Sequence, residues 1–177
     1  MRKQGVKERI IATASDLFYN QGYNQTGINQ IISEAGVPCV ADPGSKIVNF
    51  AHQFQVEVVP IVGPSSILLA LMASGLNGQN FAFIGYLPID KLDRKKKIIE
   101  LEILSRKTKQ TQIFMETPYR NIQMFEALLN VCTKLTKLCI ASNISLQNEK
   151  ITTKTIGEWK TEKVDIHKKP TIFLIQA

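Results

Sequence analysis

Several residue types are scarce in this sequence, and their scarcity excludes whole classes of protein. The chain of 177 residues has three cysteines, two histidines and one tryptophan. The cysteines, Cys39, Cys132 and Cys139, are odd in number and none are spaced as C-x-x-C. We therefore expect no disulfide framework, no zinc site and no other bound metal. Free and mostly buried thiols are the expected state.

Long apolar runs are also missing. No run approaches the roughly 18 residues that a membrane-spanning helix needs, and the longest, residues 65–75, has the length of a core helix. The N-terminus is charged like a signal peptide, but no apolar segment follows it. With 44% hydrophobic and 21% charged residues, the composition is that of a globular protein. We expect a cytoplasmic protein without a membrane span.

Acidic residues are outnumbered by basic ones. The net charge is +7 and the sequence pI is about 9.4. Much of the excess lies in three basic runs, residues 91–97, 105–109 and 167–169. Such a charge permits a polyanionic partner such as nucleic acid. Alternatively, each run is a solvated helix face or loop.

The first 36 residues have a helical pattern. Residues 7–18 carry one apolar stripe at helical period, made of Ile10, Ile11, Ala14, Leu17 and Phe18. Thr26 then suits the N-cap of a short helix that ends at Gly36. Residues 27–32 fit this helix by their apolar spacing, but a strand remains an alternative. This segment is expected to be all-helical.

From residue 37 onward, predicted strands alternate with predicted helices. The sequence Asp42-Pro43 opens a helix, and a second helix starts at Pro64 and Ser65 and stops at Gly75. Further helices are predicted over 91–104 and through Ile122, Phe125 and Leu129. Strands are predicted at 56–63, 81–86, 111–115, 137–142, 151–156 and 171–176. This alternation predicts an α/β fold with a partly parallel sheet and crossover connections.

The helical segment resembles the start of a tetracycline-repressor-family helix-turn-helix. The match lies in Ala14, Leu17, Phe18, Gly22, Tyr23, Thr26, Ile31, Ala35, Gly36 and Val37. That family's next helix reads the DNA major groove, whereas this chain continues with the sequence PCVADPG. Phosphate contacts from Arg2, Lys3 and Lys7 alone would be salt-sensitive, so we do not expect sequence-specific DNA binding. A DNA-binding regulator fragment is the alternative function.

Residues 32–177 resemble the tetrapyrrole (corrin and porphyrin) methylase superfamily, and within it the branch that methylates a ribose 2′-hydroxyl in small-subunit ribosomal RNA. Five ordered motifs carry the resemblance: 33–44, 58–76, 83–88, 113–120 and 168–175. It implies a partial Rossmann-like tetrapyrrole-methylase fold with parallel or mixed sheets and flanking helices. The predicted parts are a truncated helix-turn-helix at 1–36, the end of a first methylase domain at 37–80, and a second α/β domain at 81–177.

The resemblance implies S-adenosyl-L-methionine as cofactor, bound in a cleft between two domains. Asp42, Pro43 and Gly44 form one cofactor turn, and Pro64, Ser65 and Ser66 form another at a helix N-terminus. Met115 and Glu116 are expected on the adenosine side. The catalytic residue is not identified.

Each of these residues also has a purely structural interpretation. Asp42 suits a helix cap, and residues 63–66 suit a capped turn. Met115 suits the core, and Glu116 with Arg120 suits an ion pair at a helix start. These alternatives stay open at the level of sequence.

The predicted function is therefore S-adenosylmethionine-dependent methyl transfer, with ribosomal RNA as the expected partner. The family's opening strands have no counterpart here, which fits a chimeric gene or a fragment of the enzyme. A folded but inactive remnant that pairs through an open sheet edge is a further alternative. A homodimer is the expected form of such pairing.

Overall fold

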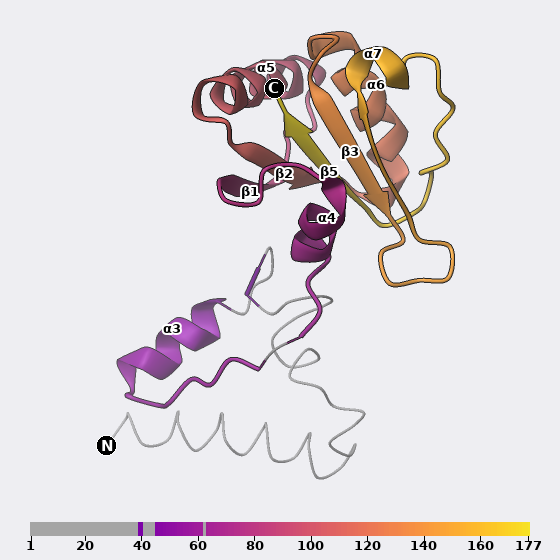
Figure 1. Cartoon of the computed structure of the whole chain (residues 1–177). Coiled ribbons are helices and arrows are strands. Elements are labelled where there is room, and N and C mark those ends of the chain that lie inside the picture. Colours follow the sequence, from indigo (N-terminus) through magenta and orange to yellow (C-terminus); the bar gives the residue numbers. More distant parts are fainter. Residues whose placement is uncertain (1–38, 41–44, 62) are drawn as a thin grey trace. The chain divides into compact units, whose positions relative to one another are not determined.

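The computed structural model describes residues 39–40, 45–61 and 63–177 (Figure 1). The chain divides into two compact units, Met1–Ser65 and Ser66–Ala177. The helices predicted within residues 1–36, the 27–32 alternative and the turn at residues 42–44 lie outside the described residues. Within the described part, no helix has the length and apolar character needed to cross a membrane.

The described part of the first unit contains one helix, α3 (Ser45–Gln53). It confirms the helix predicted after residues 42–43. The buried strand predicted at 56–63 is wrong, because residues 56–61 form no strand and residue 62 is not described. Val59 and Ile61 are 68% and 76% exposed. A β-branched run forms a strand only beside a hydrogen-bonding partner, and the described residues of this unit contain none.

The second unit is built on a five-stranded mixed sheet. Its strands have the spatial order β1-β2-β5-β3-β4. β1 and β2 are parallel, and all other neighbours are antiparallel. The strands are β1 (Phe81–Tyr86), β2 (Thr111–Met115), β3 (Lys137–Ser142), β4 (Lys150–Thr155) and β5 (Thr171–Gln176). The five strands predicted in this part of the sequence are thereby confirmed, with β4 shifted by one residue.

Helices cover both faces of this sheet (Figure 1). α4 (Ser66–Ser74) packs on one face and is stopped, as predicted, at Gly75, which has a φ of +68°. α5 (Lys91–Thr108), α6 (Asn121–Val131) and the short α7 (Ile156–Trp159) cover the other face. The helix predicted at 91–104 is thus confirmed and runs on to Thr108. The compact unit starts at Ser66 rather than at residue 81, and the three-part division of the chain stays a prediction.

Alternating strand residues supply one apolar cluster to each face of the sheet. On the α5–α6 face, Phe114 and Phe173 are fully buried and stack with ring centroids 6.0 Å apart. On the α4 face, Ile113 and Leu174 pack against Ala70. A side chain that moved to the next position along a strand would face the other cluster, so the register of the central strands is strongly specified.

Two short elements were not predicted, the 3-10 turn η1 (Pro118–Arg120) and α7. α7 starts with a capping box: Thr155 Oγ1 accepts from the Glu158 backbone N–H, and the Glu158 carboxylate accepts from the Thr155 backbone N–H. The T-x-x-E spacing at 155–158 was the sequence signal for this helix start. The helix has only four residues, which is too short for its apolar residues to show a helical period.

A buried carboxylate joins α5 to the loop that follows α6. Glu102 Oε1 accepts hydrogen bonds from the backbone N–H of Thr133 at 2.7 Å, from Thr133 Oγ1 at 3.1 Å and from Thr136 Oγ1. The Glu102 side chain is 8% exposed, and Arg106 Nη2 lies 3.9 Å from the same oxygen. The carboxylate therefore fixes the loop that leads into β3.

We expect Glu102→Ala to lower the free energy of unfolding by about 2–3 kcal/mol, because the hydroxyl of Thr136 and the N–H of Thr133 lose a charged acceptor. Urea denaturation followed by circular dichroism measures this. The matched control is Glu100→Ala, whose carboxylate pairs with Lys97 at 2.8 Å on the exposed side of α5. Its expected loss is below about 1 kcal/mol. Equal losses in both variants would contradict the role of Glu102.

The three cysteines are free in the structure, and Cys132 and Cys139 are buried. Burial, and then the charge of Glu102, raises the pKa of the Cys132 thiol from 9.0 to about 12. Burial also raises the pKa of Cys139, and a hydrogen bond with Thr153 partly opposes this. The prediction of free, mostly buried thiols is confirmed.

Because the thiolate is the reactive species, we expect iodoacetamide at pH 8.5 to leave Cys132 and Cys139 unmodified until the protein unfolds. Peptide mass spectrometry measures the modification. Between pH 9.0 and about 12 the unfolded chain loses the Cys132 proton while the folded protein keeps it. The free energy of unfolding therefore falls as the pH rises through this window. Rapid labelling of Cys132 in the folded protein would contradict its burial.

Candidate functional site

The parallel pair β1–β2 defines one edge of the second unit where a ligand is expected. α5 follows β1 and α6 follows β2, so both helices begin at the carboxyl end of this pair. β5 is antiparallel to β2, with Ile172 opposite Met115, and therefore starts at the same edge. Ligands of open α/β sheets bind outside the carboxyl ends of parallel strands. We call this edge the carboxyl edge.

Glu116 is the first residue after β2, and its side chain is fully buried. Its Oε1 accepts a hydrogen bond from the Thr117 backbone N–H at 2.6 Å and one from Arg120 Nη2 at 2.8 Å. The turn η1 places Arg120 four residues on, where the guanidinium reaches back to the carboxylate. The ion pair considered at the sequence level is therefore present, and it holds Glu116 in a single orientation.

Several buried polar atoms at the carboxyl edge have no hydrogen-bond partner among the described residues. They are Glu116 Oε2, Arg120 Nε and Asn121 Oδ1. The Asn121 amide group donates to Ile166 O at 3.0 Å and Lys169 O at 2.7 Å, which ties the start of α6 to the loop before β5. Unsatisfied buried polar atoms are rare in proteins. Several in one place indicate a site that a ligand or ordered water completes.

Met115, the last residue of β2, lies on the α4 face of the sheet. Met115 is partly buried and packs against the same apolar cluster as α4. The residues after α4 are fixed at the opposite edge, where Thr111 Oγ1 donates to Asn77 O at 2.9 Å and the Asn77 N–H donates to Gln176 Oε1 at 3.2 Å. The chain that leaves α4 is therefore fixed at the edge opposite Met115.

Met115 and Glu116 at the carboxyl edge are chemically suited to contact the predicted cofactor. The adenosine part of S-adenosylmethionine carries hydroxyl and amine donors, and Glu116 Oε2 is a buried acceptor to which no described residue donates. Met115 offers a thioether suited to contact with an aromatic base. Of the other predicted cofactor residues, Asp42, Pro43 and Gly44 lie outside the described part of the chain, and Pro64 and Ser65 belong to the first unit. Their roles stay predictions.

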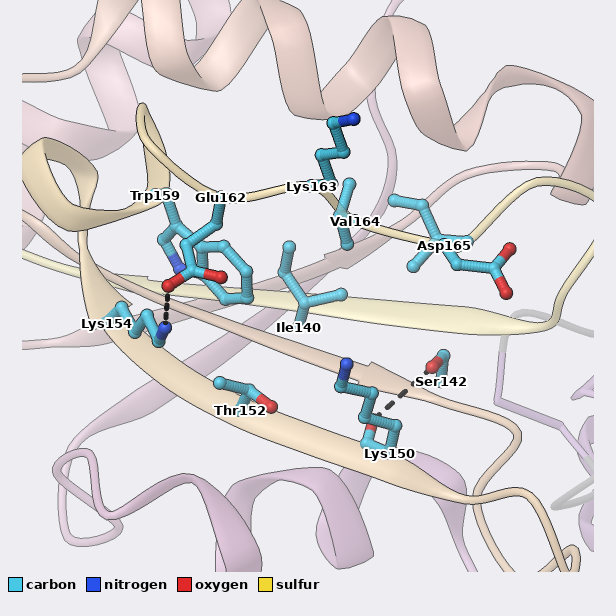
Figure 2. A pocket seen from close by; sticks show the side chains of 11 residues that line it. Ile140, Ser142, Lys150, Thr152, Lys154, Trp159, Glu162, Lys163, Val164 and Asp165 are labelled. Carbon is cyan, nitrogen blue, oxygen red and sulfur yellow. Dashed lines mark hydrogen bonds and ion pairs between the residues drawn. The ribbon is translucent and has the colours of Figure 1, made fainter.

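A groove of about 120 Å³ lies between β3, β4 and the segment after α7 (Figure 2). Lys154 pairs there with Glu162 at 2.5 Å and lies 5.6 Å from the Trp159 ring centroid. Ligand pockets are usually roughly 300–1,000 Å³, so this groove is too small for the cofactor.

Sequence reasoning missed three polar residues that the structure makes prominent, Arg94, Asn121 and Glu102. Each is less than 9% exposed despite its polarity. Arg94 and Glu102 occur in a helix with charged residues on all sides, where the sequence gives no sign of which charge faces inward. Asn121 carried a weak signal, since it immediately follows the motif at 113–120.

Comparison with known proteins places this α/β unit in a family. A profile described as "Tetrapyrrole (Corrin/Porphyrin) Methylases" matches residues 13–160. The chain therefore belongs to the tetrapyrrole methylase family, which confirms the resemblance and the fold class. The match begins within the segment predicted to be helix-turn-helix-like, and it gives no support to the alternative of a DNA-binding regulator.

Three similar curated proteins carry the name "Ribosomal RNA small subunit methyltransferase I". The Vibrio cholerae protein is 32% identical over 150 residues, which are 83% of this chain and 51% of that protein. The Halalkalibacterium halodurans protein is 36% identical over 60% of this chain and 38% of its own length. The Bacillus subtilis protein is 33% identical over 75% of this chain and 44% of its own length. The chain spans about half the length of these relatives, or less.

Two solved structures share the fold. The methyltransferase CobJ superposes with a TM-score of 0.52 at 16% identity, over 80% of this chain and 61% of that chain. A conserved hypothetical protein from Aeropyrum pernix superposes with a TM-score of 0.54 at 16% identity, over 81% of this chain and 56% of that chain. At these identities the similarity shows the fold alone.

Proposed function

We propose that this chain is part of a methyltransferase that uses S-adenosylmethionine to methylate a ribose 2′-hydroxyl of small-subunit ribosomal RNA. The observation that carries the proposal is 32% identity to a named ribosomal RNA methyltransferase over 83% of the chain. The net charge of +7 suits an RNA partner. Cytoplasmic location is part of the proposal, because ribosomal RNA is the substrate.

The carboxyl edge contributes binding and orientation to this reaction. We propose that Met115 and Glu116 contact the adenosine part of the cofactor, with Glu116 Oε2 accepting one of its hydrogen bonds. Arg120 and the Thr117 N–H hold Glu116 Oε1, which fixes the direction of the free oxygen. S-adenosylmethionine supplies a methyl group bound to a sulfonium, and when the S–CH₃ bond breaks the neutral thioether S-adenosylhomocysteine is an excellent leaving group. Alignment with the acceptor hydroxyl is therefore the main demand on the protein.

The remaining predicted cofactor residues belong to the same proposal. We propose that Asp42, Pro43 and Gly44 contribute to one side of the cofactor site, and Pro64, Ser65 and Ser66 to another. The chemistry of both is that of a helix start, where backbone N–H groups are available to a carboxylate.

Transfer of tritium from methyl-labelled S-adenosylmethionine to purified small-subunit RNA tests the function. We expect labelled RNA and a 2′-O-methyl nucleoside after digestion. Incubation with labelled cofactor and no RNA is the control. A protein that binds the cofactor but labels no small-subunit RNA would contradict the proposed substrate.

We also propose a homodimer. Support comes from β1, which among the described residues pairs only with β2 and carries Phe81 and Tyr86 at 39% and 56% exposure. An apolar strand with a free edge favours pairing with another chain. Size-exclusion chromatography with light scattering would contradict this by giving the monomer mass at all concentrations.

A further inference from the structure

One arginine is buried on the inner side of α5. Arg94, Ile98, Leu101 and Ser105 follow one another at helical spacing and form the buried stripe of this helix. Arg94 is only 5% exposed. Arginine is almost never buried to this degree unless it is paired, so its partners determine what it does.

Arg94 has very few partners. Its Nη1 donates to Ile89 O at 3.4 Å, near the limit of a hydrogen bond, and its Nε is buried with no acceptor among residues 39–40, 45–61 and 63–177. No ion pair within 4.0 Å involves it in the described part of the chain, although six other lysines and arginines of the second unit form such pairs. A guanidinium has five donors. A buried charge in this condition destabilises the fold unless an anion joins it.

Arg94 lies near the start of α5, at the end of the helix that is next to the carboxyl edge. It closes the first turn of α5, the helix that follows β1, whereas Glu116 directly follows the parallel neighbour β2 and Arg120 ends the turn η1 after it. Arg120 Nε is likewise buried without an acceptor. Two guanidinium groups with unused donors thus occur at one edge of the sheet.

Exposed lysines extend this positive charge along α5. Lys91 and Lys95 flank Arg94, are exposed, and make no ion pair within the described residues. Lys96 and Lys97, by contrast, pair with Asp93 and Glu100. A single carboxylate would need one cation, while a row of unpaired cations suits an anion with repeated charges.

We propose that Arg94 binds a phosphate group of the RNA beside the nucleotide that is methylated, and that Lys91 and Lys95 contact the phosphates that follow. The planar guanidinium suits bidentate binding of a phosphate. The identity of the polyanion as RNA rests on the proposed function. In this account the buried charge of Arg94 is retained for binding, at the expense of stability.

The test compares Arg94→Met with the unchanged 177-residue chain. Fluorescence anisotropy of a labelled single-stranded RNA from the small subunit, measured at several salt concentrations, gives affinity and its salt dependence. We expect at least about a tenfold loss of affinity and a salt slope shallower by about 0.7, the value for one phosphate of a single strand. The melting temperature is expected to stay the same or rise, because an unpaired buried charge is removed.

Arg106→Met is the matched control, since Arg106 lies on the same helix but is 55% exposed. It should leave the salt slope unchanged. If Arg94→Met lowers the melting temperature and keeps the RNA affinity, Arg94 is structural and the proposal is wrong. If Arg94→Met weakens the binding of S-adenosylhomocysteine and not that of RNA, the anion bound by Arg94 is the cofactor carboxylate and the phosphate assignment is wrong. A wild-type chain that binds cofactor but no RNA would overturn this proposal and the proposed substrate together.

Discussion

Replacing Glu116 with glutamine is expected to weaken S-adenosylhomocysteine binding by at least about tenfold while the protein stays folded. Glutamine keeps an oxygen in the place of Oε1, which accepts from Thr117 and Arg120. It puts an NH₂ group in the place of Oε2, the acceptor that has no donor among the described residues. A cofactor hydroxyl or amine would then lose a charged acceptor, which corresponds to about 1.5–3 kcal/mol. Isothermal titration calorimetry measures the affinity.

The control for this variant is Glu126→Gln, because Glu126 is an exposed residue of α6. It should bind S-adenosylhomocysteine as the wild type does. Unchanged affinity in Glu116→Gln would show that Oε2 does not contact the cofactor and would leave Glu116 as the partner of Arg120 only.

Phe173→Ala is expected to lower the free energy of unfolding by about 3–5 kcal/mol. Phe173 is fully buried in β5, the central strand, and stacks on Phe114 of β2. A domain's whole stability is only about 5–15 kcal/mol, so a large part is lost. Trp159, the sole tryptophan of the sequence and 4% exposed, reports the unfolding of this unit by its fluorescence in urea.

Phe81→Ala tests whether position, rather than the loss of an aromatic ring, determines this effect. Phe81 lies on the edge strand β1 and is 39% exposed. Its expected loss is about 1 kcal/mol, as for most single substitutions. A similar small loss for Phe173→Ala would mean that the layer between β5, α5 and α6 is not closely packed.

The strands of the second unit were predictable because each apolar run has a partner that the same sequence supplies. Residues 111–115, 137–142 and 171–176 pair with one another or with a neighbour, and their apolar residues meet helices on both faces. Residues 56–61 have the same β-branched composition but no strand beside them in the described part of the first unit. Strand propensity depends on such a neighbour, and composition alone does not reveal it.

The candidate site was predictable only in part. Residues 113–120 pointed to Met115 and Glu116, and the structure places both at the carboxyl edge. The sequence left open whether Glu116 pairs with Arg120 or faces a ligand. The structure shows the pair with Arg120 through Oε1 and leaves Oε2 without a partner among the described residues, so the ligand contact stays a prediction. Burial of Arg94 was not predictable, because it depends on which side of α5 meets the sheet.

The central claim is that the cofactor lies at the carboxyl edge of the second unit. Ultraviolet crosslinking of methyl-labelled S-adenosylmethionine, followed by tryptic mapping, tests it most directly, because cleavage after Lys109 and Arg120 isolates residues 110–120 in one peptide. The account predicts label in this peptide, suppressed by excess S-adenosylhomocysteine. Suppressible label confined to the peptides that line the small groove, such as residues 151–154, would contradict it.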